Sequence, residues 1–347
     1  MTCRFFRSSK SLRHDPDTYF RRGRIVGHPE TAERYNVLNK AAIAAGWIGE
    51  DAQDYGMDPV LAVHSEAYIA FLKSAWDRRA EVPGEPVDEI LGTHFSKPQM
   101  SRKPTGLLGE FGYFTCDTST AIREGTWDAI YWSAQSAIAA ATAALEDGVS
   151  YALCRPPGHH AFSDAAAGFC YLNNAAIAAE HFRSATQEKV AIIDIDVHHG
   201  NGAQSIFYER ADVLTTSIHC DPSDYYPFFS GYADETGEGS GFGSNLNLPL
   251  PKGSNDEDML GALEVALAAV REFSPKAVVI ALGLDAAKDD PLGAFNITTS
   301  GFQRITERIM ELALPTVLIQ EGGYLCDALP RNLEAVLQVA GASFKRN

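Results

Sequence analysis

One stretch, residues 190–202 with the sequence VAIIDIDVHHGNG, constrains the fold of this chain more than any other. Five of its first six residues are apolar and mostly β-branched, which predicts a buried strand of a parallel sheet. Side chains alternate along a strand, so we expect Asp194, Asp196 and His198 on one side and His199 on the other. Two carboxylates and an imidazole at the carboxyl end of such a strand predict a metal site. A solvated acidic strand end is the alternative for this stretch taken alone.

Three further predicted strands end in side chains that can do chemistry. The short strand YALC runs into a Pro-Pro-Gly turn that cannot be helical and that presents His159 and His160 side by side. Adjacent histidines on a rigid turn favour a proton-transfer pair, whereas a lone histidine is most often a core or surface filler. A buried strand over 277–284 ends in Asp285. In TVLIQEGGY, two glycines let the backbone carry Tyr324 over a pocket, with an ordinary strand-to-loop turn as the alternative.

Composition narrows the class of protein. A chain of 347 residues with 45% hydrophobic content can bury one large α/β core. A net charge of -16 argues against nucleic acid or an anionic membrane as partner and favours a cationic small molecule or peptide. The six cysteines are scattered without a C-x-x-C pair, so we expect reduced thiols in a cytoplasm. Neither a membrane span nor a signal peptide is recognisable.

The rest of the chain alternates helices with strands. The opening segment to about residue 26 is predicted to be a surface arm. Residues 78–112 contain four prolines and five glycines without periodicity, which predicts a long irregular insertion that serves as a lid or a subunit contact. The remaining expected elements are helices over 28–46, 65–77, 127–148 and 174–183 and strands over 151–154 and 213–219.

Taken in order, these strand ends resemble the histone deacetylase superfamily, which has the arginase/deacetylase fold. RPPGHH, DIDVHHGNG, LGLDAAKDDPLG and EGGY occur in family order and at family-like spacing from about residue 28 onward. EGTWDA, LCRPPGHHA, GNGAQSIFYER and GYADETGEG look most like bacterial acetylpolyamine amidohydrolases, and Asn201 matches the class II side of the superfamily. The resemblance implies one domain over 1–347, built as an α/β three-layer fold with a central, mostly parallel sheet flanked by helices.

The resemblance also implies a metal set. Asp196, His198 and Asp285 match the family's Zn²⁺ ligands, with one ion per subunit and positions left open for water and substrate. Fe²⁺ could substitute, because nitrogen and oxygen ligands select weakly between these metals. Arginase chemistry instead needs a D-x-H-x-D motif for two manganese ions, whereas this chain has the order D-x-D-x-H, which argues for one metal. A structural K⁺ site of the family matches Asp194, Asp196, His198, Ser217 and Ile218, partly through backbone oxygens.

Catalytic roles follow from the same matches. His160 would act as general base on the attacking water and as the acid that protonates the leaving amine, while His159 supplies electrostatic help. Asp194 would orient His159, and Asn201 would hold His160. Tyr324 would donate a hydrogen bond to the oxyanion, a role in which loss of one donor costs on the order of 100-fold in rate.

Substrate contacts are carried over in the same way. Arg34 matches an arginine that lines an internal product channel of the family. The rim carboxylates do not align cleanly with the family pattern, so the preferred polyamine stays open. The expected substrate-binding residues are Phe169 and Tyr226 as aromatic walls, Gly168, Tyr19, and the acidic rim candidates Asp17, Asp117 and Glu110.

Three functions are compatible with these residues. The favoured one is zinc-dependent deacetylation of acetylputrescine, acetylcadaverine or acetylspermidine by a homodimer or a dimer of dimers, in which residues 78–112 narrow the entrance. The second is a protein acetyl-lysine deacetylase, or a deacylase of other N-acyl amides, which needs an open rim. The third is a non-catalytic binding module, which the complete set of expected ligands and histidines disfavours.

Overall fold

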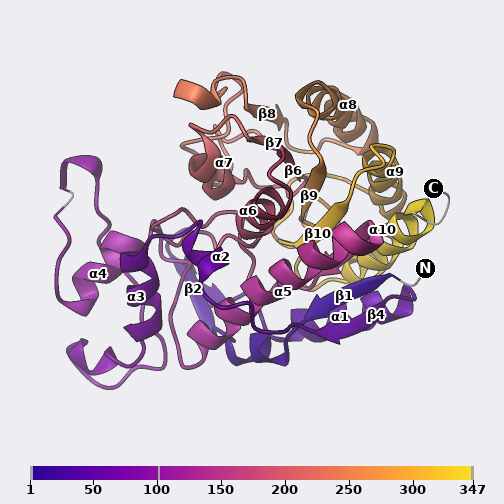
Figure 1. Ribbon diagram of the computed structural model, residues 1–347. Helices are drawn as coiled ribbons and strands as arrows, with labels where there is room; N and C mark the ends of the chain where they lie inside the picture. Colours follow the sequence, from indigo (N-terminus) through magenta and orange to yellow (C-terminus); the bar gives the residue numbers. More distant parts are fainter. Residues whose placement is uncertain (1–2, 101, 345–347) are drawn as a thin grey trace.

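The computed structural model describes residues 3–100 and 102–344, and its centre is an eight-stranded sheet (Figure 1). All pairs of neighbouring strands in this sheet are parallel. The sheet confirms the expected fold class. In spatial order its strands are β4 (Ile48–Asp51), β1 (Arg4–Arg7), β5 (Val149–Ala152), β10 (Thr316–Gln320), β9 (Ala277–Leu282), β6 (Val190–Asp194), β7 (Val213–Cys220) and β8 (Asn245–Leu250).

Helices cover both faces of the sheet and create two hydrophobic cores. Alternation along β9 shows the division, because Val279 packs in the first core and Ile280 in the second. The first core is covered by α3 (Glu66–Ser74), α4 (Leu107–Phe114), α5 (Thr126–Asp147) and α6 (Asn174–Thr186). The second is covered by α1 (Glu33–Ala44), α8 (Asp256–Phe273), α9 (Thr299–Met310) and α10 (Ala328–Phe344). The short helices are α2 (Asp58–Leu61) and α7 (Asn201–Phe207), with 3-10 turns η1 (Ser9–Arg13), η2 (Arg79–Glu81), η3 (Pro98–Met100) and η4 (Gly239–Gly241).

The central strands are buried along their whole length, as their continuous apolar runs predict. Two expected strands have shifted ends: the one over 151–154 is β5, two residues earlier, and the one over 277–284 ends at Leu282. The expected helix over 28–46 begins only at Glu33. The backbone before it is held in another conformation, because Arg155 donates to the carbonyls of Glu30 and Thr31.

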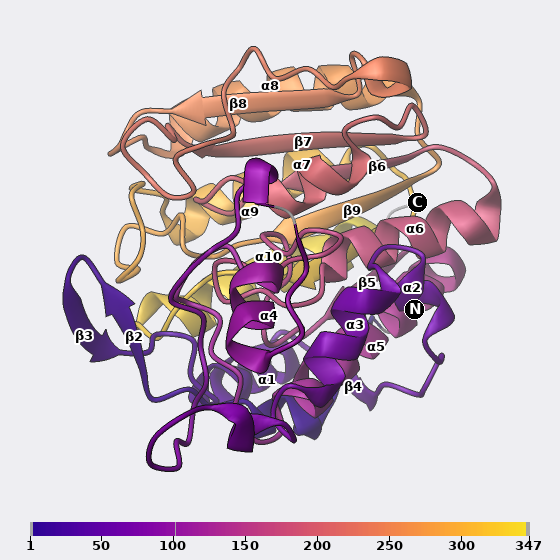
Figure 2. The ribbon, with the colours of Figure 1, turned by 90° about the vertical axis from the view of Figure 1, so that its left-hand side faces the viewer.

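The opening segment is not a surface arm throughout, which corrects the expectation from the sequence. Strand β1 lies inside the sheet between β4 and β5, where Phe5 is fully buried. The arginines at its two ends hid this strand, because charged residues are not typical of a buried strand. Arg4 is accommodated because it pairs with Asp147 at the end of α5. Further along, β2 (Thr18–Arg21) and β3 (Arg24–Gly27) form an antiparallel hairpin. Figure 2 shows this hairpin on the side to which β8 points, at the carboxyl ends of the strands.

The boundary of the expected insertion over 78–112 is also wrong at its end, since α4 begins at Leu107. Leu107, Phe111 and Phe114 are buried at helical spacing, a signal that the nearby glycines masked. Within the described part of the segment, the remainder contains only η2 and η3. Figure 1 shows α3 and α4 with this loop at one end of the molecule, away from the C-terminus. None of the described helices is long and apolar enough to cross a membrane.

The loop packs against α4 at Gly112, and replacement of this glycine tests the packing. A β-carbon at Gly112 would lie 1.6 Å from the carbonyl oxygen of His94, so backbone would have to move. We expect Gly112→Ala to lower the free energy of unfolding by about 1–3 kcal/mol, measured by denaturant titration. Gly106→Ala is the matched control, because no atom lies within 4 Å of its added carbon. Equal stability of the two variants would contradict the described packing.

Candidate metal centre and active site

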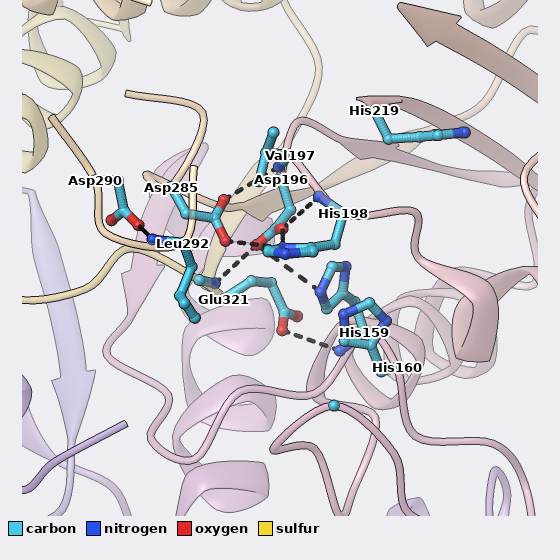
Figure 3. A network of polar contacts seen from close by, with 12 residues as sticks. His159, His160, Asp196, Val197, His198, His219, Asp285, Asp290, Leu292 and Glu321 are labelled. Atoms are coloured by element: carbon cyan, nitrogen blue, oxygen red, sulfur yellow. Dashed lines mark hydrogen bonds and ion pairs between the residues drawn. The ribbon is translucent and has the colours of Figure 1, made fainter. Parts of the chain in front are cut away.

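Three side chains from two neighbouring strand ends converge at the carboxyl edge of the sheet (Figure 3). Asp196 and His198 follow β6, and Asp285 follows β9. One potential ligand atom from each lies within 4.8 Å of the others. His198 Nδ1 lies 3.1 Å from Asp196 Oδ1 and 3.1 Å from Asp285 Oδ2. The structure therefore brings together the trio expected to bind metal.

The geometry behind this convergence differs from the one expected. Strand β6 ends at Asp194, so strand alternation does not place Asp196 and His198. Instead, two successive turns are closed by hydrogen bonds from backbone amides to aspartate side chains. The amide of Asp196 donates to Asp194 Oδ1 at 3.0 Å, and the amide of His198 donates to Asp196 Oδ1 at 2.9 Å. Close glycines complete the fit, because a β-carbon at Gly283 would lie 2.3 Å from Asp196 Oδ2.

The chemistry of this donor set fits a divalent cation. Asp196 and Asp285 are fully buried, and two carboxylates cannot both remain charged there without compensation. Burial raises the pKa of Asp285, and the nearby charge of Asp196 raises it further. Burial lowers the pKa of His198, but the two carboxylates outweigh this effect and raise it to about 9. Carboxylate oxygens and imidazole nitrogens both bind zinc, and catalytic zinc sites use three protein ligands, so the residues present fit the expected ion.

The tandem histidines have different partners. His159 Nδ1 lies 2.9 Å from Asp194 Oδ2, and His160 Nδ1 lies 2.7 Å from Asn201 Oδ1. Both oxygens accept, so each Nδ1 carries its hydrogen, and Nε2 of a neutral His160 keeps a lone pair. Burial opposes protonation of His159, but Asp196 and Asp194 raise its pKa to about 10. Burial and the positive charge of His159 lower the pKa of His160, so His160 is the neutral member of the pair at pH 7.

The side chain of Glu321 fixes the turn that leads into these histidines. Glu321 Oε2 accepts hydrogen bonds from the amides of Gly158 at 2.6 Å and His159 at 3.0 Å. A β-carbon at Gly158 would lie 2.4 Å from the amide nitrogen of Asn174, so this position needs glycine. Burial raises the pKa of Glu321 to about 7. The sequence analysis missed this role of Glu321, although the residue stands directly before the glycines of EGGY.

Tyr324 is held over the same site by a buried arginine. Arg34 Nε donates to the carbonyl of Gly323 at 2.7 Å, and its guanidinium carbon lies 4.8 Å from the centre of the Tyr324 ring. Gly323 has φ 111°, a conformation that favours glycine. The Tyr324 amide donates to Asp290 Oδ2 at 2.7 Å. Asp290 therefore anchors the loop that carries Tyr324.

The charge of Arg34 is balanced inside the protein. Arg34 is fully buried, and its Nη1 donates to Glu30 Oε1 at 2.6 Å. The same oxygen lies 3.0 Å from Nε of Arg155, which is also fully buried. Arg34 Nη2 donates to the carbonyl of Glu321 at 2.8 Å. Two buried guanidinium groups thus share one carboxylate beneath the Tyr324 loop, and the sequence analysis missed Glu30 and Arg155.

A cavity of about 300 Å³ opens above these groups. The expected residues Tyr19, Asp117, His159, His160, Gly168, Phe169, His198, Tyr226 and Tyr324 all line it. Lining residues that the sequence analysis missed are Phe20, Arg21, Arg22, Asp224, Tyr225, Phe228 and Leu292, among others. Tyr225 lies parallel to the His198 ring at a centroid distance of 5.0 Å. Its aromatic neighbourhood in the sequence was the only available signal for this contact.

Two of the expected rim carboxylates do not line the cavity. Asp17 is exposed and lies 3.8 Å from Arg123, and Glu110 on α4 pairs with Arg78. Arginines distant in the sequence therefore engage both carboxylates away from the cavity. Asp117 does line it, but its Oδ2 accepts from the Tyr226 hydroxyl at 2.7 Å and from the Gly168 amide at 3.1 Å. Asp117 thus fixes the cavity wall.

Three of the residues matched to a K⁺ site lie on adjacent strands, and Asp196 and His198 follow one of these strands. Asp194 on β6 and Ser217 on β7 are register partners, and Ile218 follows Ser217 in a fully buried strand. The hydroxyl of Ser217 lies 2.8 Å from Nδ1 of His219. A cation bound here would therefore share the Ser217 hydroxyl with this imidazole.

Comparisons with known proteins agree with this geometry. The sequence pattern of the histone deacetylase domain matches residues 28–340. The chain is 45% identical over 340 residues to the acetylpolyamine amidohydrolase of Burkholderia pseudomallei, covering 97% of this chain and 98% of that protein. It is 46% identical over 290 residues to acetylpolyamine amidohydrolase 1 of Pseudomonas aeruginosa, covering 82% of this chain and 83% of that protein. A crystal structure of the acetylpolyamine aminohydrolase from B. pseudomallei superposes with a TM-score of 0.95 at 42% identity, covering 98% of this chain and 99% of that one.

Replacement of one ligand tests the metal centre. We expect the wild-type protein to retain about one equivalent of zinc after loading and desalting, and Asp285→Ala to retain little, because one of three ligands is lost. Asp289→Ala is the matched control, since Asp289 is exposed four residues further along. Elemental analysis by mass spectrometry gives the stoichiometry. Equal zinc in both variants would show that Asp285 does not bind it.

Proposed function

This chain belongs to the histone deacetylase domain family, and on that premise we propose that it is a zinc-dependent amidohydrolase that removes acetyl groups from N-acetylated polyamines. The products would be acetate and the free amine. The observation that carries the proposal is that His198, both tandem histidines and Tyr324 line one cavity. Relatives named acetylpolyamine amidohydrolase support the substrate class.

Asp196, His198 and Asp285 would hold the Zn²⁺ ion, and Fe²⁺ would suit the same donors. When bound, such a cation supplies Lewis-acid polarisation of the amide carbonyl and of the attacking water. A structural K⁺ held by Asp194, Ser217 and neighbouring backbone oxygens is part of the proposal.

His160 would move the protons of the reaction. Its Nδ1–H is fixed on Asn201, so Nε2 is free to take a proton from the attacking water and later to give it to the leaving amine. His159, kept cationic by Asp194 and Asp196, would stabilise negative charge that develops beside it. The ring centroids of His159 and His160 lie 3.9 Å apart, so the positive charge of His159 favours release of the proton that His160 takes up.

Tyr324 would donate its hydroxyl to the oxyanion. Burial raises the pKa of this phenol well above its ordinary value, so the group stays a donor at neutral pH. Arg34 and Asp290 bond the two ends of the peptide group between Gly323 and Tyr324, which lowers the entropy cost of orienting the ring during the reaction. Phe169 lies 6.0 Å from the Tyr324 ring and, with Tyr226, would enclose the aliphatic chain of the substrate.

We further propose a cytoplasmic homodimer or dimer of dimers in which residues 78–112 narrow the entrance. No described residue of this segment lines the cavity of the single chain. An entrance that is open in one chain also favours a second candidate function, deacetylation of acetyl-lysine in peptides. The two functions differ in whether a bulky peptide backbone can reach the mouth.

Removal of single functional groups tests the mechanism. We expect Tyr324→Phe to lower kcat by on the order of 100-fold, because the oxyanion loses one donor. His160→Ala should abolish most activity as well, since the base is lost. Both variants should keep their zinc, because neither residue belongs to the ligand trio. Tyr232→Phe is the matched control, as its hydroxyl bonds only the carbonyl of Phe228 at the surface.

A substrate panel separates the two candidate functions. Acetylputrescine, acetylcadaverine, acetylspermidine and an acetyl-lysine peptide are compared by kcat/KM on the zinc-loaded protein. We expect an acetylated diamine to exceed the peptide by roughly tenfold or more, because the narrowed cavity excludes a peptide backbone. A preference for the peptide would replace the first function by the second.

A further inference from the structure

The mouth of the cavity carries positive charge in a strongly acidic protein. The chain has a net charge of -16, yet Arg21 and Arg22 of the β2–β3 hairpin line the cavity. Tyr19 and Arg21 stand two residues apart on β2, so they share one face of the strand, and both are half-buried. Arg22 follows in the turn and is exposed. The hairpin thus brings two arginines and Tyr19 to the same cavity.

Both guanidinium groups lack a partner among the described residues. Across residues 3–100 and 102–344, no hydrogen bond or ion pair engages the side chain of Arg21 or Arg22. The carboxylates that share the cavity are already occupied. Asp224 lies 2.6 Å from Lys252 Nζ, and Asp117 Oδ2 accepts from Tyr226 and Gly168. The two arginines are therefore available to a ligand.

Both arginines act on the groups around the mouth. Burial raises the pKa of Tyr19, and the positive charges of Arg21 and Arg22 oppose this rise. Lys252 lowers the pKa of Asp224, and Arg22 contributes in the same direction. The positive field therefore reaches across the entrance. A guanidinium presents a planar fork of donors that matches a carboxylate, and a second guanidinium lining the same cavity adds to the attraction for an anion.

We propose that Arg21 and Arg22 form a carboxylate-binding subsite at the mouth, and that the preferred substrates are acetylated diamines that carry a carboxylate at the end far from the acetyl group. The inference rests on the proposed function, since the reacting amide and its chemistry are unchanged. Free Nε-acetyl-lysine, which is acetylcadaverine with one added carboxylate, represents this class. A long polyamine is disfavoured, because a second ammonium group at the mouth would meet two guanidinium groups.

Three compounds isolate the contribution of the carboxylate. Nε-acetyl-lysine has the carboxylate and the α-ammonium group, Nε-acetyl-lysinamide has the ammonium group and a neutral amide in place of the carboxylate, and acetylcadaverine has the ammonium group alone. We expect kcat/KM for Nε-acetyl-lysine to exceed that for its amide by roughly tenfold, the effect of one charge-assisted contact. This preference runs against the net charge of the chain, which repels anions at long range.

Variants of the hairpin assign the preference to these arginines. Arg21→Gln and Arg22→Gln should each lower the ratio of kcat/KM for Nε-acetyl-lysine to that for its amide, and the double variant should bring it to about one. Arg24→Gln is the matched control, because Arg24 faces Arg21 across the hairpin but does not line the cavity. Its ratio should equal that of the wild type. Thermal unfolding verifies that each variant is folded.

Calorimetric titration distinguishes failure of the subsite from failure of the proposed function. Tighter binding of Nε-acetyl-lysine than of its amide, lost in the double variant, supports the subsite even where no compound is hydrolysed; that combination would refute the proposed function alone. Equal binding and equal kcat/KM of the two compounds, or a ratio unchanged by Arg21→Gln and Arg22→Gln, would overturn the subsite. Hydrolysis of acetylcadaverine would leave the proposed function standing in that case.

Discussion

The site depends on two fully buried carboxylates, Asp196 and Asp285, that face one imidazole at the floor of the cavity. Uncompensated charges of like sign cost several kcal/mol when they are buried, so the arrangement requires positive charge between them. His198 supplies part of it when protonated, and a divalent cation would supply it without a proton. The parallel sheet makes this concentration possible, because it ends neighbouring strands β6 and β9 at one edge.

A second buried network keeps the catalytic loops in place. Glu30 lies between Arg34 and Arg155, and Arg34 donates to the carbonyls of the loop that carries Tyr324. Glu321 in turn fixes the turn that carries the tandem histidines. Loops from β5 and β10 are thus bonded to each other below the cavity. Such a foundation is what lets donors point at the place where charge develops, instead of reorienting during the reaction.

The sequence predicted the elements whose signal is local. Continuous apolar runs identified β6, β9 and β10, and the polar residues after them identified the trio that converges at the sheet edge and Tyr324 beside it. It failed where the deciding contact is remote. Asp17 and Glu110 were expected at the rim, but arginines distant in sequence engage both. The turns at Asp196 and His198 are local, but the apolar run predicted continued strand alternation there in place of backbone-to-carboxylate bonds. No local pattern shows that the β2–β3 hairpin brings arginines to the cavity.

The central claim is that Asp196, His198 and Asp285 together bind one divalent ion. The most direct measurement is a crystal structure of the zinc-loaded protein with anomalous diffraction collected on both sides of the zinc absorption edge. The account predicts one strong anomalous peak per chain, within about 2.0–2.2 Å of one oxygen from each carboxylate and of one His198 nitrogen. A difference map without a peak among these three residues, or with the ion held elsewhere, would contradict it.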